Sequence, residues 1–351
     1  MVFIYNSLSI LLLGVLLNKK LENSKYKKIY LLICFIQMAL IQGLRSYSVG
    51  TDTSMYVDTY NNYLYKDIYA FQFTHFEYGF QLLYTIFQNI NLEAQQMLIV
   101  ISGLTMFGFA YFIYKNSKNV CLSTFIFACM LYPNSFNIMR QYLAISIAIN
   151  SYQLIINNKY IKASLLIIIA SLIHTTAYLM FIPLILYLVK NWKLVRKIIV
   201  ISSVIFFVFG NQIVNAILPI LGKSFYASGF EVNRFFRLTT FLTIITAILT
   251  WYFTKKTTDQ DSKKNLNLLT EIAFVNVSFG ILYLKYEFFS RIIELLNCFL
   301  IVSMPMGISN IKSYYKPLIR YGIYFVSFLL MLNSVYNSGS GIEIYKMYFM
   351  I

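Results

Sequence analysis

The sequence predicts an all-α integral membrane protein with about twelve transmembrane helices. Of its 351 residues, 59% are hydrophobic and only 12% are charged, and the mean hydropathy is +0.65. A soluble domain carries about 25% charged residues. Apolar runs of about 15 to 22 residues recur along the whole chain, near the length that crosses hydrocarbon as a helix. We therefore expect one polytopic membrane domain over 1–351.

Twelve of these apolar runs are candidate spans. They cover residues 2–17, 28–44, 95–114, 119–133, 137–157, 160–173, 175–190, 197–218, 238–254, 266–284, 291–309 and 318–334. A further run at 78–90 has about 13 residues, which is typical of a re-entrant or interfacial helix. It belongs to a polar, tyrosine-rich stretch at about 45–93 that we expect to lie outside the membrane.

The distribution of charge predicts the topology. The net charge of +16 suggests nucleic acid at first, but Lys and Arg collect in short loops between the runs, as the positive-inside rule requires. The densest basic loop, at 19–28, is therefore placed in the cytoplasm. If 78–90 does not cross, twenty of the 29 basic residues lie inside. Both termini are then extracytoplasmic, and no nucleic-acid partner is predicted.

No metal or cofactor is predicted either. The four cysteines, Cys34, Cys121, Cys129 and Cys298, sit in apolar runs without CxxC or metal-ligand spacing. Buried free cysteines of this kind are packing residues. The few external carboxylates also lack the spacing of metal ligands.

Nine basic residues remain outside in this topology: Arg45, Lys66, Arg140, Lys223, Arg234, Arg237, Lys285, Arg291 and Lys346. A charge near hydrocarbon costs about 2.5–3.5 kcal/mol on the lenient insertion scale. An internal partner, a water-filled cavity or an anionic ligand must offset that cost.

Arg140 lies near the start of the fifth span. Asn134, Asn137 and Arg140 or Gln141 recur at i, i+3 spacing and share one helix face. A guanidinium and two amides at a helix N-terminus make a good phosphate cradle. The alternative is an asparagine cap beside an arginine that snorkels to the interface.

Two further pairs have the same i, i+3 spacing. Arg291 and Glu294 open a span from the outer side and form either a structural ion pair or an anion site. Arg234 and Arg237 precede another span, where they either bind an anion or anchor the helix at the interface.

His174 and Asp52 also have two interpretations each. His174 follows Ser171-Leu-Ile at an outer span end, where it is either a core residue or a group that titrates near the substrate. Asp52, in Gly50-Thr51-Asp52-Thr53, is either a turn residue or part of a site.

The candidate residues share one side of the membrane. Those predicted outside are Arg45, Asp52, Glu77, Arg140, His174, Arg234, Arg237, Arg291 and Glu294. Their common location predicts a polar, cation-rich cavity that opens outward beneath an acidic and aromatic loop. Such a cavity suits a substrate with an anionic lipid end and a carbohydrate end.

Five segments carry a resemblance that runs from about 45 to 310. They are Arg45 with Val49-Gly50-Thr51-Asp52-Thr53 and Tyr56, then Glu77-Tyr78-Gly79, then Asn137 with Arg140-Gln141 and Ala144, then Ser171-Leu-Ile-His174, and Arg291. In this order they resemble the EpsG-like, Wzy-type polysaccharide polymerases of bacteria. Tyr78 departs from the pattern, which has a small or proline-like residue there.

This resemblance implies an enzyme of the bacterial cytoplasmic membrane. Such enzymes join polyprenyl-diphosphate-linked oligosaccharide repeats on the outer face, for capsule or exopolysaccharide. The growing glycan moves from its lipid diphosphate to the non-reducing end of an incoming repeat, without nucleotide sugar. The implied fold is similar to the membrane glycosyltransferase (GT-C-like) and O-antigen polymerase and ligase bundles. A flippase and a chain-length regulator of the same pathway are the implied protein partners.

The polymerase hypothesis assigns a role to each candidate residue. Arg140 and Arg291 stabilise the departing diphosphate, and Arg234 and Arg237 hold the second lipid head group. The base candidates are Asp52, Glu77, His174 and Glu294, with Glu77 and Asp52 favoured. The remaining substrate-binding candidates are Arg45, Thr51, Thr53, Tyr56, Asn137 and Gln141.

Three other functions compete with polymerisation. A flippase for the same lipid-linked repeats also needs a cationic cavity, but it needs charge reachable from both faces. An O-antigen-type ligase has nearly the same parts. A membrane acyltransferase is disfavoured, because no His-Asp-type pair occurs in an apolar run.

Overall fold

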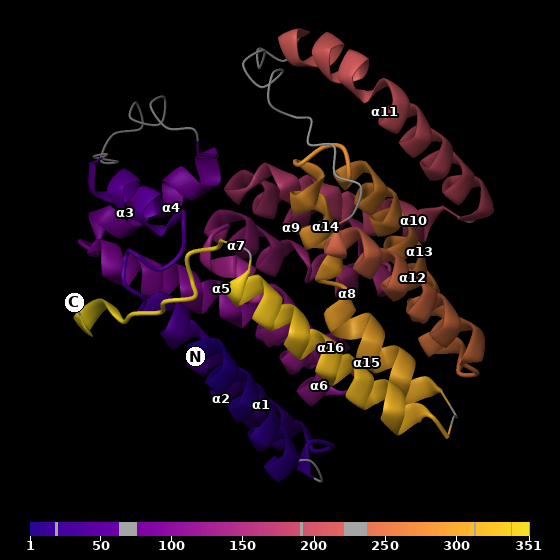
Figure 1. Ribbon diagram of the computed structural model, residues 1–351, viewed down its shortest axis with the longest axis horizontal. Coiled ribbons are helices and arrows are strands. Elements are labelled where there is room, and N and C mark those ends of the chain that lie inside the picture. The colour runs from indigo at the N-terminus through magenta and orange to yellow at the C-terminus, as the bar shows by residue number, and fades with distance from the viewer. Residues whose placement is uncertain are drawn as a thin grey trace. The chain divides into compact units, whose positions relative to one another are not determined.

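The computed structural model describes residues 1–17, 20–62, 76–189, 192–220, 237–311, 314–337 and 339–350. Within these ranges the chain is helical (Figure 1), and its only extended pairing is an isolated bridge between Arg45 and Met347. The chain divides into two compact units. The first contains Met1–Met180 with Ser313–Ile351, and the second contains Phe181–Lys312.

The first unit is a bundle of short and long helices. Its α-helices are α1 (Val2–Leu17), α2 (Ser24–Gly43), α3 (Thr53–Asn62), α4 (Tyr78–Asn89), α5 (Ala94–Asn116), α6 (Val120–Ile126), α7 (Met139–Ala148), α8 (Ser151–Ile156), α9 (Tyr160–Ile173) and α16 (Lys316–Tyr336). A π-helical turn, Phe127–Leu131, continues α6, and 3-10 turns occupy Asn134–Phe136, Thr175–Met180 and Tyr348–Met350.

Helix α2 is central to the packing of this unit. It lies beside α1 and against α5 (Figure 1), and α7 packs between α5 and α9. Polar side chains in the interior are paired: the Tyr132 hydroxyl donates to the Met38 carbonyl at 2.7 Å, and the Gln42 amide donates to Ser135. Such hydrogen bonds provide partners for polar groups that would find none in lipid.

The segment after α2 is fixed by the end of the chain. Backbone N–H groups of Ser46 and Gly50 donate to the carbonyls of Lys346 and Gly341 at 2.9 and 2.8 Å. The N–H of Tyr348 donates back to the Leu44 carbonyl at 2.8 Å. These bonds hold the loop before α3 in one conformation, which matters because this loop contains Asp52.

The second unit contains α10 (Phe181–Leu188), α11 (Trp192–Ile220), α12 (Leu238–Lys256), α13 (Gln260–Tyr283), α14 (Phe289–Asn297) and α15 (Leu300–Asn310). Helix α13 packs against α12, α14 and α11. Interhelical hydrogen bonds link Thr254 to Thr270 and Asn276 to Asn297, each at 2.8 Å. Arg196 of α11 forms an ion pair with Glu271, which is buried in α13.

The prediction of about twelve spans is not confirmed. Among the described residues, five helices are long and apolar enough to cross a membrane: α5, residues 194–213 of α11, α12, α13 and α16. The pair α14 and α15, bent by 40°, makes a sixth if it counts as one span.

Several apolar runs fold as short or broken helices. The run 119–133 becomes the seven-residue α6 with its π-helical turn, and 137–157 becomes α7 and α8, of ten and six residues. A hydropathy profile detects the apolar run but not the break in the helix within that run. The described part of the chain is therefore all-helical, with five or six candidate spans of a multi-pass protein, and the description of the chain as a single membrane domain stays a prediction.

Candidate functional site

A cluster of ionisable side chains in the first unit is centred on Glu77. Its Oε2 lies 2.5 Å from Nη1 of Arg140, and its Oε1 lies 2.7 Å from Nδ1 of His174. The backbone N–H of Thr175 donates to Oε1 at 3.1 Å. One carboxylate thus joins residues that are 63 and 97 positions away in the sequence.

Three helix ends bring these groups together. Glu77 is the N-cap of α4, Arg140 lies in the first turn of α7, and His174 is the C-cap of α9. The extended backbone of His174 (φ −154°, ψ 124°) turns the chain at the end of α9 into the 3-10 turn that begins at Thr175. Each of the three side chains therefore comes from the end of an element and not from a helix interior.

Gly79 allows α4 to approach α9. A Cβ at this position would lie 2.6 Å from the carbonyl oxygen of Leu172, which is closer than real Cβ atoms come to backbone. Leu172 is two residues before His174. The glycine of the Glu77-Tyr78-Gly79 motif is therefore needed for the contact between Glu77 and His174.

The Glu77 carboxylate is held in its charged form. Burial alone raises the pKa of this group, but hydrogen bonding and attraction to His174, with attraction to Arg140, outweigh it. The net result lowers the pKa of Glu77 from 4.5 to about 2. At neutral pH this carboxylate is a fixed anion and a poor proton acceptor.

Aromatic rings enclose Arg140. Its guanidinium carbon lies 4.1 Å from the ring centroid of Phe76 and 6.0 and 5.9 Å from those of Tyr56 and Phe80. A cation over ring faces is stabilised electrostatically. These rings and Glu77 together offset the cost of placing a guanidinium in a largely buried position.

Two donor or acceptor atoms of the cluster lack partners among the described residues. Both Nε2 of His174 and Nε of Arg140 are buried without a hydrogen bond. An ionised carboxylate only accepts hydrogen bonds, so Nδ1 of His174 carries the proton that points to Glu77. In the neutral imidazole, Nε2 then holds the lone pair.

Asn137 ties the Asp52 loop to the start of α7. Its Oδ1 accepts from the backbone N–H of Thr51 at 2.9 Å, and its Nδ2 donates to the Ser340 carbonyl at 2.9 Å. Gly50 has φ +92°, and a Cβ there would lie 2.7 Å from Asn137 Oδ1. Asp52, two residues after Gly50, accepts from the Thr51 hydroxyl at 3.1 Å.

Arg45 is fully buried and cross-links three segments. Its guanidinium donates to the carbonyls of Gln42 and Phe136, at 2.8 and 3.2 Å, and to the Thr53 hydroxyl at 3.2 Å. Thr53 in turn donates to the Val49 carbonyl at 2.7 Å. The side chains of Arg45 and Thr53 therefore both stabilise the loop that contains Asp52. Gln141 is also buried, next to Arg140 in the first turn of α7.

Arg237 forms a separate ion pair in the second unit. Its two terminal nitrogens lie 3.1 and 2.6 Å from the two carboxylate oxygens of Glu287, a bidentate arrangement. Its guanidinium carbon is 3.6 Å from the ring centroid of Tyr283. Arg237 itself is buried, whereas the Glu287 side chain is half exposed.

The other predicted residues of the second unit are Arg291 and Glu294. Both lie in α14, where Arg291 is exposed and Glu294 is half-buried. Arg234 lies outside the described residues. The gathering of arginines from both units around one substrate stays a prediction.

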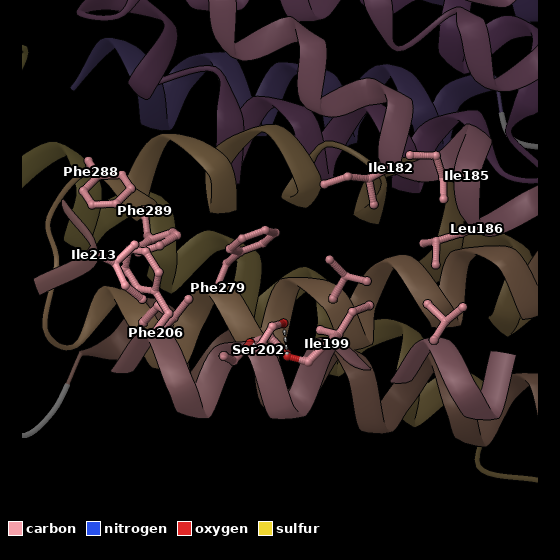
Figure 2. A pocket seen from close by; sticks show the side chains of 15 residues that line it. Ile182, Ile185, Leu186, Ile199, Ser202, Phe206, Ile213, Phe279, Phe288 and Phe289 are labelled. Carbon is pink, nitrogen blue, oxygen red and sulfur yellow. Dashed lines mark hydrogen bonds between the residues drawn. The ribbon is translucent and has the colours of Figure 1, made fainter. Parts of the chain in front are cut away.

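An apolar cavity of about 640 Å³ lies within the second unit. Figure 2 shows it between Ile182, Ile185 and Leu186, residues of α11 such as Ile199 and Phe206, and the phenylalanines Phe279, Phe288 and Phe289. The hydroxyls of Ser202 and Ser203 in its wall donate to the Ile199 carbonyl. The wall therefore offers few free polar groups, and its chemistry suits a hydrocarbon chain.

Some residues of these clusters are not among those predicted from the sequence. They are Phe76 and Thr175 in the first unit and Glu287 in the second, and the role of Gly79 was likewise not predicted. The one local signal for Glu287 is an isolated carboxylate between two apolar runs, close to an arginine-bearing span. The ring of Phe76 gives no such signal, because aromatic residues are common at membrane interfaces.

The fold and the cluster together define a class: a helical multi-pass membrane protein with a largely buried carboxylate–arginine–histidine cluster at helix ends. The model of the EpsG family matches residues 28–349, and the chain belongs to this family. The resemblance found in the sequence is thereby confirmed. Membership indicates a membrane function of the polysaccharide-polymerase type. No curated protein and no solved structure matches the chain, so similarity to membrane glycosyltransferase and ligase bundles is not confirmed.

Proposed function

We propose that the protein joins polyprenyl-diphosphate-linked oligosaccharide repeats on the outer face of the bacterial cytoplasmic membrane. The glycan leaves one lipid diphosphate and moves to the non-reducing end of an incoming lipid-linked repeat. The observation that carries this proposal is the Glu77 cluster, because it combines an anion-binding guanidinium with an imidazole whose orientation is fixed.

Arg140 receives the phosphate. A guanidinium has five N–H donors, and the contact with Glu77 uses Nη1. The buried Nε lacks a partner among the described residues, so it is suited to a phosphate oxygen. A fixed cation near the departing diphosphate stabilises the charge that develops on it.

His174 takes the proton. As the bond between the anomeric carbon and the diphosphate oxygen breaks, the diphosphate keeps the electron pair. The acceptor hydroxyl oxygen bonds to that carbon, and its proton moves to Nε2 of His174. Glu77 orients the imidazole and stabilises its charged form, which is the role of the carboxylate in other carboxylate–histidine pairs. With a pKa of about 2, Glu77 is a weaker base than the sequence argument assumed.

The remaining predicted residues have supporting roles. Asp52 is a second candidate for the base, held near α7 through Thr51 and Asn137. The roles of the second-unit residues stay as predicted from the sequence: Arg291 for the departing diphosphate, Arg237 for the second lipid head group and Glu294 as a further candidate for the base. The apolar cavity of the second unit is suited to a polyprenyl chain.

The test is reconstitution with a defined lipid-linked repeat. Wild-type protein in vesicles should produce a ladder of polymer lengths, and Arg140→Ala and His174→Ala should abolish it while inserting normally. Lys255→Ala, which removes an exposed cation at the end of α12, is the control and should leave the ladder unchanged. Wild-type chain length in either site variant would refute the assignment.

A transporter of the same lipid-linked repeats is the second candidate. One observation favours it: a cavity lined by basic residues at the Lys27 end of α2, far from Glu77. An assay in the same vesicles distinguishes the two functions, because a transporter moves the labelled repeat across the bilayer without lengthening the glycan.

A further inference from the structure

A cavity of about 700 Å³ with a mixed polar and apolar lining lies within the first unit, at the Lys27 end of α2. Its lining comes from α1, the turn that follows it, the first turn of α2, the α5–α6 connection and the first half of α16. The polar lining residues include Glu22, Lys27, Lys118, Arg320, Tyr321 and Tyr324.

The length of α2 separates this cavity from the Glu77 cluster. Lys27 lies in the first turn of the 20-residue helix, and Arg45, which supports the Asp52 loop, follows its last turn. At 1.5 Å per residue the two ends are about 30 Å apart, close to the thickness of the hydrocarbon core. Helix α5, one of the candidate spans, packs along α2, and its C-cap Ser117 lines this cavity. On that basis we place the cavity near the opposite face of the membrane, which is cytoplasmic in the predicted topology.

The charge around the cavity is mainly positive. Lys27, Lys118 and Arg320 line the cavity together with Glu22, the one carboxylate among its described lining residues. Within the described part of the chain, none of the three cations has a carboxylate oxygen within 4.0 Å, and Nε of Arg320 is buried without a hydrogen bond. The Lys27 ammonium donates to the Ser117 carbonyl at 3.4 Å and lies 5.4 Å from the ring centroid of Tyr114, and neither partner is an anion at neutral pH. Three gathered cations repel one another unless an anion lies between them.

The other walls have the character of a membrane interface. Leu11, Gly14 and Val15 of α1 provide an apolar wall, and Tyr321 and Tyr324 of α16 lie beside the basic residues. Tyrosine is enriched where hydrocarbon meets the head groups. Basic pockets between helices on the cytoplasmic side are suited to phosphate-bearing head groups.

We propose that this cavity binds a phosphate-bearing anion, held by Lys27, Lys118 and Arg320 at the membrane face opposite the Glu77 cluster. The proposal is independent of the polymerase reaction, since none of these residues belongs to that cluster. Phosphate chemistry is common to an anionic phospholipid, a polyprenyl diphosphate and a soluble diphosphate, and the experiment separates these sources.

The experiment measures binding to the full-length protein in phosphatidylcholine nanodiscs. Three arms add phosphatidylglycerol, a polyprenyl diphosphate or inorganic diphosphate, and native mass spectrometry and thermal melting report binding. The double variant Lys27→Gln with Arg320→Gln should bind about thirtyfold more weakly in the arm that holds the true ligand, since each charge is worth about five- to sixfold. The control is Lys255→Gln with Lys256→Gln, which removes two exposed cations of α12 and should bind as wild type.

A second substitution keeps the test meaningful if the double variant folds poorly. Lys118 is exposed, so Lys118→Glu reverses one charge of the cavity without disturbing the interior. It should also weaken binding, whereas Arg320→Lys should retain part of it. Equal binding by wild type, the double variant and Lys118→Glu in all three arms would overturn the proposal, whatever the outcome of the polymer assay.

Discussion

Replacing Glu77 with glutamine tests the centre of the cluster most directly. The substitution preserves shape but removes the charge that Arg140 and His174 share. The pKa of Glu77 falls from 4.5 to about 2 on folding, a difference of about 2.5 pH units. At 1.36 kcal/mol for each unit, the carboxylate contributes about 3 kcal/mol to the free energy of unfolding at neutral pH. This agrees with the cost of about 3–5 kcal/mol for breaking one partner of a buried pair.

The contribution of Glu77 depends on pH with a definite sign. Because the pKa is lower in the folded protein, the stabilisation is fully present above about pH 5 and is lost as the pH falls toward 2. By the same relation, about 1 kcal/mol of this stabilisation remains at pH 3. Glu77→Gln should therefore be less stable than wild type at pH 7, and the difference should narrow by more than half at pH 3.

Unfolding in mixed micelles by added denaturing detergent, followed at pH 7 and pH 3, measures this difference. Glu343→Gln neutralises an exposed carboxylate and serves as the control, with no change expected at either pH. Polymer formation at pH 7 should be lost in Glu77→Gln, because His174 loses its orienting anion. A stability difference that is absent at pH 7, or equally large at pH 3, would show that the Glu77 contacts are wrong.

Three further substitutions test the geometry around the cluster. Gly79→Ala places a methyl group against the Leu172 carbonyl and should reduce polymer formation at least tenfold, whereas Gly103→Ala, which meets nothing within 4 Å, should not. Asn137→Ala removes two hydrogen bonds and should lower the free energy of unfolding by about 1–3 kcal/mol in the same detergent titration; an unchanged midpoint would contradict the structural link. Arg237→Lys keeps the charge but loses the bidentate pair with Glu287, and it should shorten the polymer ladder on a gel. A wild-type ladder would show that the reaction does not need this ion pair.

The amino-acid sequence identified most residues of the Glu77 cluster but not the contacts between them. Glu77, Arg140 and His174 were singled out individually, because ionisable groups near apolar runs are costly and need compensation. Their pairing links positions 63 and 97 residues apart, and no local pattern carries that information. For the same reason Glu77 was favoured as a base, although its contacts make it a fixed anion in the folded protein.

The amino-acid sequence by itself determined the class of the molecule: a helical, multi-pass membrane protein of the EpsG family. Hydropathy and charge asymmetry are sums over neighbouring residues, so they can be calculated from the chain alone. Tertiary structure decided which apolar runs are broken, as at 119–133, and which charges are buried, as for Arg45. Those outcomes depend on contacts between distant helices, which lower the free energy only after the chain has folded.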